Sequence, residues 1–231
     1  MKTLIIISHP DIQDSSSQRF LQESLPQSVD ITVHHLEAVY PDGKIDIQRE
    51  QQLLREHDRI IFQFPFYWYS SPAMLKHWQD EVLAENFAYG ARGRSLQGKE
   101  LGLVLVIGVG EKEYQVGGTE GFSISTLTTP YQALANKLQM TFLKPFPIFQ
   151  FQYMTEHEKM TLLLSYQQYV TMQNYDSLRE KEKWYLQQLA KLKIEVDSDH
   201  TLLVIDQMEE VIEDHRMELD EIQMYIDGEV I

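Results

Sequence analysis

The sequence predicts an α/β protein with a doubly wound sheet of five parallel strands, in the order 2-1-3-4-5, and a C-terminal helical extension. Short apolar runs alternate with amphipathic stretches, the pattern of strands and crossover helices in a parallel sheet. The run LGLVLVIG at residues 101–108 is apolar on both faces, as a buried central strand requires. Because crossovers are right-handed, these strands form an open, doubly wound sheet.

The remaining elements follow from the same periodicity. The expected strands are residues 3–8, 29–35, 59–64, 101–108 and 141–149, the last interrupted by Pro145 and Pro147. The expected helices begin near Ser16 and then cover residues 47–57, 72–83 and 129–139. Residues 155–192 are too many for one globular helix, and Asn174, Asp176 and Ser177 offer a stop and a new start, so we expect two helices there.

We assign residues 1–192 to one domain and residues 193–231 to an acidic C-terminal extension. The extension holds 13 acidic and 2 basic side chains, a net charge of -11 out of -15 for the whole chain. Apolar residues at three- and four-residue steps predict a helix with a heptad seam. This seam would pack on the first domain, on a second subunit or on another protein, and the competing interpretation is a solvated or frayed end. Its members are Ile205, Met208, Ile212, His215, Leu219, Ile222 and Ile226.

The composition excludes several classes of protein. Of the 231 residues, 43% are hydrophobic and 24% are charged, which is ordinary for a globular chain. The acidic balance disfavours binding to nucleic acid. No apolar run approaches the ~18 residues of a membrane span. The absence of cysteine and a start, MKTLIIISHP, that does not resemble a signal peptide favour a cytoplasmic location.

Ligands of open α/β sheets bind beyond the carboxyl ends of the strands, so the loops there are the candidate sites. After the first strand, residues 9–19 bring hydroxyls and free backbone N–H groups to a helix N-terminus, which suits an anion such as a phosphate. The alternative is that Ser15 or Ser16 only caps the helix, and on the serines alone this alternative is favoured. His9 alone is also more often a structural histidine.

After the third strand, the segment PFYWYSSP at residues 65–72 contains four consecutive aromatic residues directly after Pro65, namely Phe66, Tyr67, Trp68 and Tyr69. Successive side chains of an extended segment point to opposite sides, so the four cannot all be buried together. Some must face a cleft, where a planar heteroaromatic ligand can stack, or a partner interface rich in tyrosine and tryptophan.

After the fourth strand, residues 108–121 are rich in glycine and contain Tyr114. Glycine lets the backbone approach a ring closely or adopt positive φ, and the Tyr114 hydroxyl is a donor and an acceptor. Such a loop is weak evidence alone, but three unusual loops at one edge of the sheet are stronger together.

Other kinds of site lack their residues. His34, His35 and His157 have no further ligands nearby in the sequence, so no metal site is expected. Neither a Gly-x-Ser-x-Gly motif nor a Walker loop is present, which argues against a hydrolase or a nucleoside triphosphatase.

Three motifs together resemble the NAD(P)H quinone reductase family, which has a flavodoxin-like fold. They are His-Pro before a serine-rich helix start, the segment QFPFYWYSSPAMLKHWQDEVL from Gln63, and Tyr-x-x-Gly-Gly from Tyr114. The family includes DT-diaphorase, the modulator of drug activity proteins and potassium-efflux ancillary subunits. The resemblance covers about residues 1–192 and is most specific over residues 63–82.

The resemblance implies a non-covalent flavin, FMN or else FAD, with NADPH or NADH as the hydride donor and a quinone-like acceptor. Donor and acceptor would use the same ring face in turn, which gives a ping-pong reaction. Tyr114 would be the catalytic side chain. The cofactor-binding residues implied are His9, Ser15, Ser16, Ser17, Gln18, Pro65, Phe66, Tyr67, Trp68, Gly108, Val109, Gly110, Tyr114, Gly117 and Gly118.

Two positions depart from the family pattern. Val106 and Ile107 stand where diaphorases have a pair of threonines, so a hydroxyl contact to the flavin is lost. Glu120 stands where the mammalian enzyme has a histidine, so Tyr114 must act with a different partner, or with backbone and water.

Two functions therefore remain open. One is an FMN-dependent reductase of quinones, nitro compounds or azo compounds by two-electron transfer. The other is a regulatory flavodoxin-like subunit that acts through a protein partner such as a potassium-efflux system, an alternative kept open by the acidic extension. An electron-carrier flavodoxin is less favoured. We also expect a two-fold homodimer, because family members share their cleft between subunits and aromatics such as Tyr67 and Tyr69 exceed what one subunit can cover.

Overall fold

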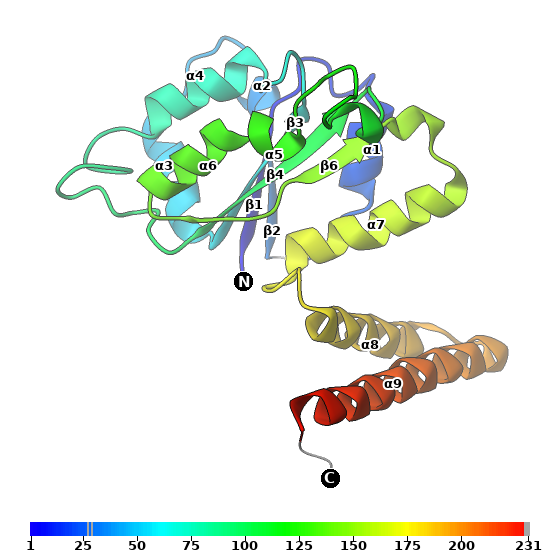
Figure 1. The fold of residues 1–231 in the computed structure, drawn as a ribbon. Coiled ribbons are helices and arrows are strands. Elements are labelled where there is room, and N and C mark those ends of the chain that lie inside the picture. Colours follow the sequence, from blue (N-terminus) through cyan, green and yellow to red (C-terminus); the bar gives the residue numbers. More distant parts are fainter. Residues whose placement is uncertain (27, 29, 229–231) are drawn as a thin grey trace. The chain divides into compact units, whose positions relative to one another are not determined.

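The computed structural model describes residues 1–26, 28 and 30–228 (Figure 1). The chain divides into two compact units, Met1–Thr171 and Met172–Ile231, which are described separately. Among the described residues, no helix is both long and apolar enough to cross a membrane.

The first unit is built on a parallel sheet in the order β2-β1-β3-β4-β5, which confirms the predicted topology. The strands are β1 (Thr3–Ile7), β2 (Ile31–His35), β3 (Arg59–Pro65) and β4 (Glu100–Ile107), followed by two short segments at the edge. The central strand β1 pairs with β2 on one side and with β3 on the other. Val29, expected in the second strand, lies outside the described residues.

The expected fifth strand is two segments, β5 (Thr141–Phe142) and β6 (Phe146–Phe149). Both pair in parallel with β4, β5 at its start and β6 at its end. Pro145 lies in the break between them, whereas Pro147 lies inside β6, opposite Leu105. Proline has no N–H to donate to a neighbouring strand, so it is tolerated within β6 because that strand is at the edge of the sheet.

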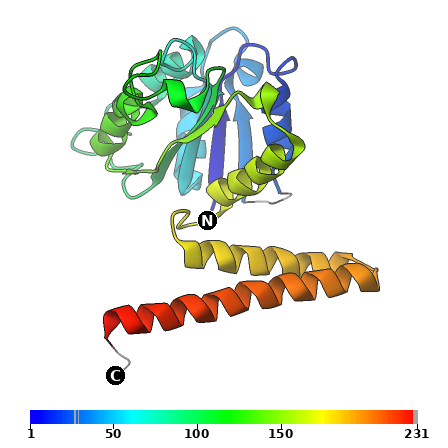
Figure 2. The same ribbon diagram turned by 45° about the vertical axis from the view of Figure 1, so that its right-hand side comes forward.

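Helices cover both faces of this sheet, with α3, α4 and α6 on one face and α1 and α7 on the other (Figures 1 and 2). The core on the α3, α4 and α6 face includes Leu4, Phe62 and Trp78, and each such side chain contributes about 1.5–3 kcal/mol through burial. The helices of the unit are α1 (Ser16–Glu23), α2 (Leu36–Val39), α3 (Ile47–Glu56), α4 (Ala73–Val82), α5 (Ile124–Leu127), α6 (Thr129–Lys137) and α7 (Glu156–Thr171).

The same face holds a buried carboxylate, Glu50 of α3, which is 0% exposed. The Tyr40 hydroxyl donates to its Oε1 at 2.5 Å, and the Trp78 indole N–H donates to its Oε2 at 2.8 Å. His34 Nε2 lies 2.9 Å from Oε1. Burial by itself would raise the pKa of Glu50, but these hydrogen bonds outweigh it and hold the pKa below its usual value. The carboxylate therefore ties β2, α3 and α4 together.

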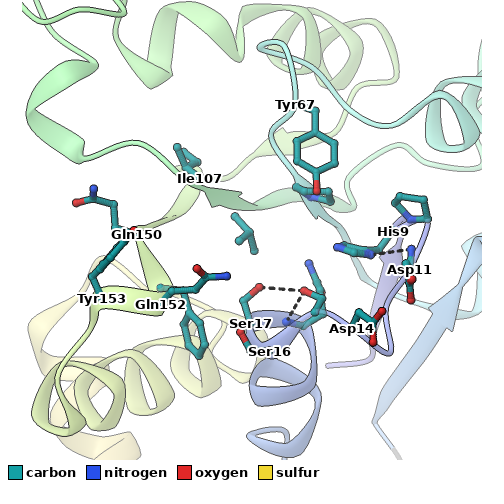
Figure 3. Close-up of a pocket in the computed structure, with 17 residues that line it drawn as sticks. His9, Asp11, Asp14, Ser16, Ser17, Tyr67, Ile107, Gln150, Gln152 and Tyr153 are labelled. Carbon is teal, nitrogen blue, oxygen red and sulfur yellow. Dashed lines mark hydrogen bonds between the residues drawn. The ribbon is translucent and has the colours of Figure 1, made fainter.

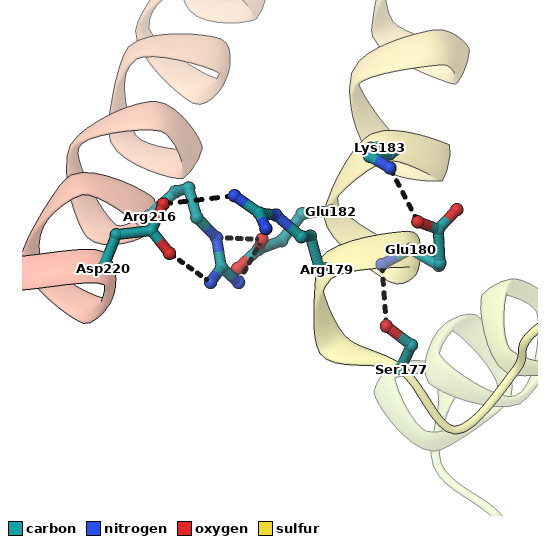
Figure 4. A network of polar contacts seen from close by, with 7 residues as sticks. All are labelled: Ser177, Arg179, Glu180, Glu182, Lys183, Arg216 and Asp220. Carbon is teal, nitrogen blue, oxygen red and sulfur yellow. Dashed lines mark hydrogen bonds and ion pairs between the residues drawn. The ribbon is translucent and has the colours of Figure 1, made fainter. Parts of the chain in front are cut away.

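The second unit contains a hairpin of two helices, α8 (Leu178–Glu195) and α9 (Asp199–Asp227). Ser177 and Ser198 cap their N-termini, which confirms the expected stop and restart before α8. Ion pairs join the two helices along their length. Arg179 pairs with Asp220 and Arg216 pairs with Glu182 across the two helices, and Arg216 also pairs with Asp220 within α9 (Figure 4). Lys193 of α8 pairs with Asp206 of α9.

The structure groups α8 with α9 in the second unit. Our division of the chain between residues 192 and 193 stays a prediction. Within this chain, the apolar residues of the expected heptad seam are only partly covered. Ile205 is buried and Ile212 half-buried, whereas Met208, His215, Leu219, Ile222 and Ile226 are exposed. The reason is that the ion pairs of Glu209, Arg216 and Asp220 occupy positions that an apolar seam would otherwise use.

Candidate functional site at the carboxyl ends of the strands

A pocket of about 450 Å³ lies beyond the carboxyl ends of β1, β3 and β4 (Figure 3). The loop between β1 and α1 supplies one wall, from His9 to Gln18, and the segment Gln150 to Tyr153 lies across from it. Pro65, Tyr67 and residues 106–108 complete the lining. Of the three loops expected at this edge of the sheet, the pocket brings together the first loop, part of the second and only the start of the third.

The N-terminus of α1 opens into this pocket. Ser15 is its N-cap, and the Ser15 Oγ accepts a hydrogen bond from the backbone N–H of Gln18 at 3.3 Å. The Ser15 and Ser17 hydroxyls lie 3.2 Å apart, and Ser15, Ser16 and Ser17 all line the pocket. Capping and ligand binding are therefore compatible here. The first-turn N–H groups and the helix dipole make this end of the pocket suitable for an anion.

Gln18 adds a buried amide to the same end of the pocket. Its side chain is 0% exposed, and its Oε1 accepts a hydrogen bond from Gln63 Nε2 at 2.7 Å. The Gln18 Nε2 has no hydrogen-bond partner among the described residues. Because a buried N–H without a partner costs about 1–3 kcal/mol, this group is well matched to an acceptor atom of a ligand.

His9 contributes a neutral imidazole. Its Nδ1 accepts a hydrogen bond from the backbone N–H of Asp11 at 3.1 Å, so the proton of the neutral ring is on Nε2. Burial lowers the pKa of His9, against the opposing effect of Glu37. His35 Nε2 lies 2.9 Å from the His9 carbonyl oxygen and fixes this loop from behind. His9 can therefore act as an N–H donor at the pocket wall.

The other end of the pocket is lined mostly by apolar residues. Pro65 ends β3 and Tyr67 lies just beyond it, whereas Val106 and Ile107 end β4 and Gly108 follows it. A side chain at Gly108 would meet no protein atom within 4 Å, so the glycine leaves this wall open. One end thus offers hydroxyls and N–H groups and the other an apolar surface that includes the Tyr67 ring, which suits a ligand with an anionic group and a ring system.

Several expected residues do not line the pocket. Phe66 is buried in the core at 7% exposure, and Val109 packs against that core. Trp68 is 92% exposed. It lies in a tight turn closed by Ser70 N–H donating to the Tyr67 carbonyl at 3.0 Å. Both central residues of this turn have positive φ, 48° at Trp68 and 62° at Tyr69, a conformation that side chains other than glycine adopt at a free-energy cost.

The glycine-rich loop after β4 shapes a neighbouring surface rather than the pocket wall. Gly117 has φ 88°, and a side chain at Gly118 would lie 2.3 Å from the Glu113 carbonyl oxygen, so both positions require glycine. Gly110 permits a close approach of Gln150, because a Cβ there would be 3.2 Å from its Oε1. Gly117 and Gly118 therefore fold the loop that carries Tyr114.

Tyr114 is 8% exposed and packs on Phe149, with ring centroids 5.9 Å apart. It does not line the pocket. Burial raises its pKa, and the nearby charge of Glu120 raises it further. Glu120 also accepts a hydrogen bond from Tyr69 and thereby raises the pKa of that hydroxyl. Glu120 thus forms a hydrogen bond with Tyr69 and acts on Tyr114 only through its charge.

The sequence interpretation missed the wall formed by Gln150, Phe151, Gln152 and Tyr153. These residues follow β6, and the short helix η2 (Phe151–Tyr153) begins after Gln150, which has φ 49°. Their position at the carboxyl end of a fifth parallel strand was the signal available, since all such ends meet at one edge of the sheet. Asp11 and Asp14, also not predicted, add two carboxylates to the lining.

Across the described ranges, no group of three or more histidine, aspartate or glutamate side chains is arranged to hold a metal ion. The chemistry of the lining is instead that of hydrogen-bond donors, hydroxyls and aromatic or aliphatic surfaces.

The model of a family described as having a flavodoxin-like fold matches residues 1–170 of this chain. The chain is 49% identical over 146 residues to YrkL, an NAD(P)H oxidoreductase of Bacillus subtilis, and the match covers 63% of this chain and 84% of the relative. It is 42% identical over 148 residues to KefG of Yersinia pestis, a glutathione-regulated potassium-efflux system ancillary protein, with coverage of 64% and 81%.

Two solved structures resemble the first unit closely. An NADPH-quinone reductase from P. pentosaceus is 40% identical, with a TM-score of 0.71, covering 75% of this chain and 100% of that one. The general stress protein 14 from Treponema denticola, in complex with FMN, is 35% identical, with a TM-score of 0.66 and coverage of 73% and 95%.

Proposed function

This chain belongs to the flavodoxin-like NAD(P)H oxidoreductase family, and from that premise we propose that it is an FMN-dependent reductase of quinone-like acceptors. NADPH or NADH would donate the hydride, and the acceptor would be a quinone or a nitro or azo compound, reduced by two electrons in a ping-pong reaction. The observation that carries this proposal is the pocket with hydroxyls and N–H groups at the N-terminus of α1 and an apolar wall at the ends of β3 and β4. We place this activity in the cytoplasm.

The described residues fit FMN. Its phosphate would take hydrogen bonds from the Ser15 and Ser17 hydroxyls and from the Gln18 amide, which otherwise has a buried N–H without a partner. The isoalloxazine ring would lie against Pro65 and Tyr67, beside the wall left open at Gly108. The FMN complex of the Treponema denticola structure supports FMN rather than FAD.

When bound, FMN supplies the ring that accepts and releases the hydride, and the protein orients it. The residues around the pocket would hold the phosphate, stack on the ring and exclude water. Tyr114, beside Glu120, would act near the acceptor by stabilising developing negative charge with its hydroxyl. Its raised pKa keeps this hydroxyl protonated at neutral pH, so it is a donor and no nucleophile.

The direct test is the visible spectrum of the purified protein, recorded before and after addition of NADPH or NADH under anaerobic conditions. We expect a yellow protein that bleaches with a nicotinamide and regains its colour when a quinone is added. A protein that binds neither FMN nor FAD at micromolar concentration would refute the proposal.

We expect Tyr114→Phe to bind FMN with normal affinity and to reduce acceptors more slowly, by about 10- to 100-fold, since one preorganised donor is lost. The pocket should be unaffected because Tyr114 does not line it. Single-turnover measurements of flavin reduction and reoxidation separate the two half-reactions. Equal rates for the variant and the parent protein in both would remove Tyr114 from the mechanism.

We further propose a two-fold homodimer in which the exposed turn at Trp68 contacts the second subunit. The support is that this turn keeps two aromatic side chains at positive φ, with Trp68 almost fully exposed, an arrangement that suits a protein contact. Light scattering checks the proposal, and a monomeric mass at micromolar concentration with full activity would contradict it. In this arrangement Trp68→Ala weakens the association of the dimer more than it weakens flavin binding within one subunit.

A second candidate function is regulation of a membrane transport system through a protein contact. The observation that favours it is the hairpin α8–α9, which lies outside the matched family region and carries the exposed side chains Met208, Val211 and Ile222. The KefG relative is named as an ancillary protein of a potassium-efflux system, which is consistent with this role. A variant ending at Thr171 discriminates the two, because the reductase function should survive the deletion and a regulatory contact made by the hairpin should not.

A further inference from the structure

A buried chain of three polar side chains connects α7 to the pocket. The Tyr166 hydroxyl donates to Gln63 Oε1 at 2.7 Å, and Gln63 Nε2 donates to Gln18 Oε1 at 2.7 Å. Each of the three side chains is 0% exposed. The chain ends at Gln18 Nε2, which lies at the pocket and lacks a hydrogen-bond partner among the described residues.

The direction of this chain decides which atom Gln18 presents to a ligand. A glutamine amide has an acceptor end and a donor end of nearly the same shape, and the two can exchange by rotation. A tyrosine hydroxyl can also accept, but if Gln63 turned over, the buried Tyr166 O–H would lose the acceptor that it has among the described residues. While Tyr166 donates to Gln63, Gln63 donates in turn to the Gln18 oxygen, which leaves the Gln18 N–H for the pocket. If both amides turned over, Gln18 would present its oxygen to the pocket instead. An anion stabilises the first arrangement and is repelled by the second.

We infer that Tyr166 and Gln63 are positioning residues, which hold the Gln18 amide with its N–H toward the phosphate end of the pocket. Neither residue lines the pocket, so neither touches a ligand there. Gln63 lies in β3 and Tyr166 lies in α7. Both side chains are buried, so water does not compete for their hydrogen bonds. The inference rests on the proposed function in taking the bound phosphate to be that of FMN.

The test replaces Tyr166 by Phe. Phenylalanine keeps the ring, including its contact with Phe146, but removes the O–H that fixes the direction of the chain. We expect the dissociation constant for FMN to rise about 10- to 100-fold, the size of a hydrogen bond to a charged group, with less than about a 3-fold change for riboflavin, which lacks the phosphate. Quenching of flavin fluorescence during titration measures both constants without any turnover.

Tyr169→Phe is the matched control. Tyr169 lies one turn further along α7, is 1% exposed and accepts a hydrogen bond from the backbone N–H of Leu103 at 3.1 Å, away from the pocket. This variant should lose stability to a similar degree and keep its FMN affinity. If Tyr166→Phe does not fold, Gln63→Met breaks the same chain from the strand side and should show the same selective loss of FMN.

The outcomes separate this inference from the proposed function. A parent protein that binds neither flavin refutes the proposed function. The relay would still be supported if inorganic phosphate raised the melting temperature of the parent protein and of Tyr169→Phe but not that of Tyr166→Phe. If Tyr166→Phe and Tyr169→Phe bind FMN equally, or if Tyr166→Phe loses riboflavin as strongly as FMN, the relay is overturned.

Discussion

Ser17→Asp is expected to weaken FMN binding at least 100-fold while leaving the fold intact. A carboxylate at Ser17 would lie beside the phosphate position, where two unit charges about 4 Å apart repel by about 4 kcal/mol at an effective dielectric constant of 20. The same carboxylate lies in the first turn of α1, where negative charge is favourable to the helix. The melting temperature of the flavin-free variant should therefore be equal to that of the parent protein or higher.

Ser17→Asn is the control for this experiment, because asparagine has the shape of aspartate without its charge. It should weaken FMN binding only modestly, through loss of the Ser17 hydroxyl and its contact with Ser15. Riboflavin should bind both variants with similar affinity, since it carries no phosphate. Equal FMN dissociation constants for the Asp and Asn variants would place the phosphate elsewhere and would remove the α1 terminus from the site.

Much of the fold was accessible from the sequence because its periodicity reflects burial directly. The strands β3 and β4 are mostly buried on both faces, and the sequence shows this as runs that are largely apolar, interrupted in β3 by Arg59 and Gln63. The helices α2 and α5 have only four residues each, too few for a period to be read, and were not predicted. The division at residues 171 and 172 lacked a compositional signal, because α8 becomes part of the second unit only through its contacts with α9.

The site was harder to predict than the fold, because the position of a residue in the sequence does not show where its side chain points. The run of four aromatic residues from Phe66 to Tyr69 indicated that some of them must be exposed. Only the folded turn shows which ones, because it buries Phe66 and exposes Trp68. Gln63 interrupts an otherwise apolar strand, and this was a signal that a buried polar partner was needed. Its partners Gln18 and Tyr166 lie far away in the sequence and could be identified only in the folded chain.

Glu50→Met is expected to cause the largest loss of stability of any change considered for this protein. Methionine fits the space but leaves the Tyr40 hydroxyl, the Trp78 indole N–H and His34 without their common acceptor in the core. Removing one partner from a buried charged network costs about 3–5 kcal/mol, which corresponds to a fall in melting temperature of roughly 10 °C for a unit of this size. None of these residues lines the pocket, so FMN affinity per folded molecule should not change.

The pH dependence of this loss identifies its cause. The pKa of Glu50 is held below its usual value of 4.5 in the folded protein, so its ionised form contributes stability that is fully present above that value and is lost as the pH falls through the folded-state pKa. The difference in unfolding free energy between the parent protein and Glu50→Met should therefore be constant near neutral pH and shrink below about pH 4.5. Denaturant unfolding measured between neutral and acidic pH checks this, with Glu56→Met as an exposed control on the same helix that should lose less than about 1 kcal/mol. A loss that is the same at every pH would mean that packing volume, and not the ionised carboxylate, holds β2, α3 and α4 together.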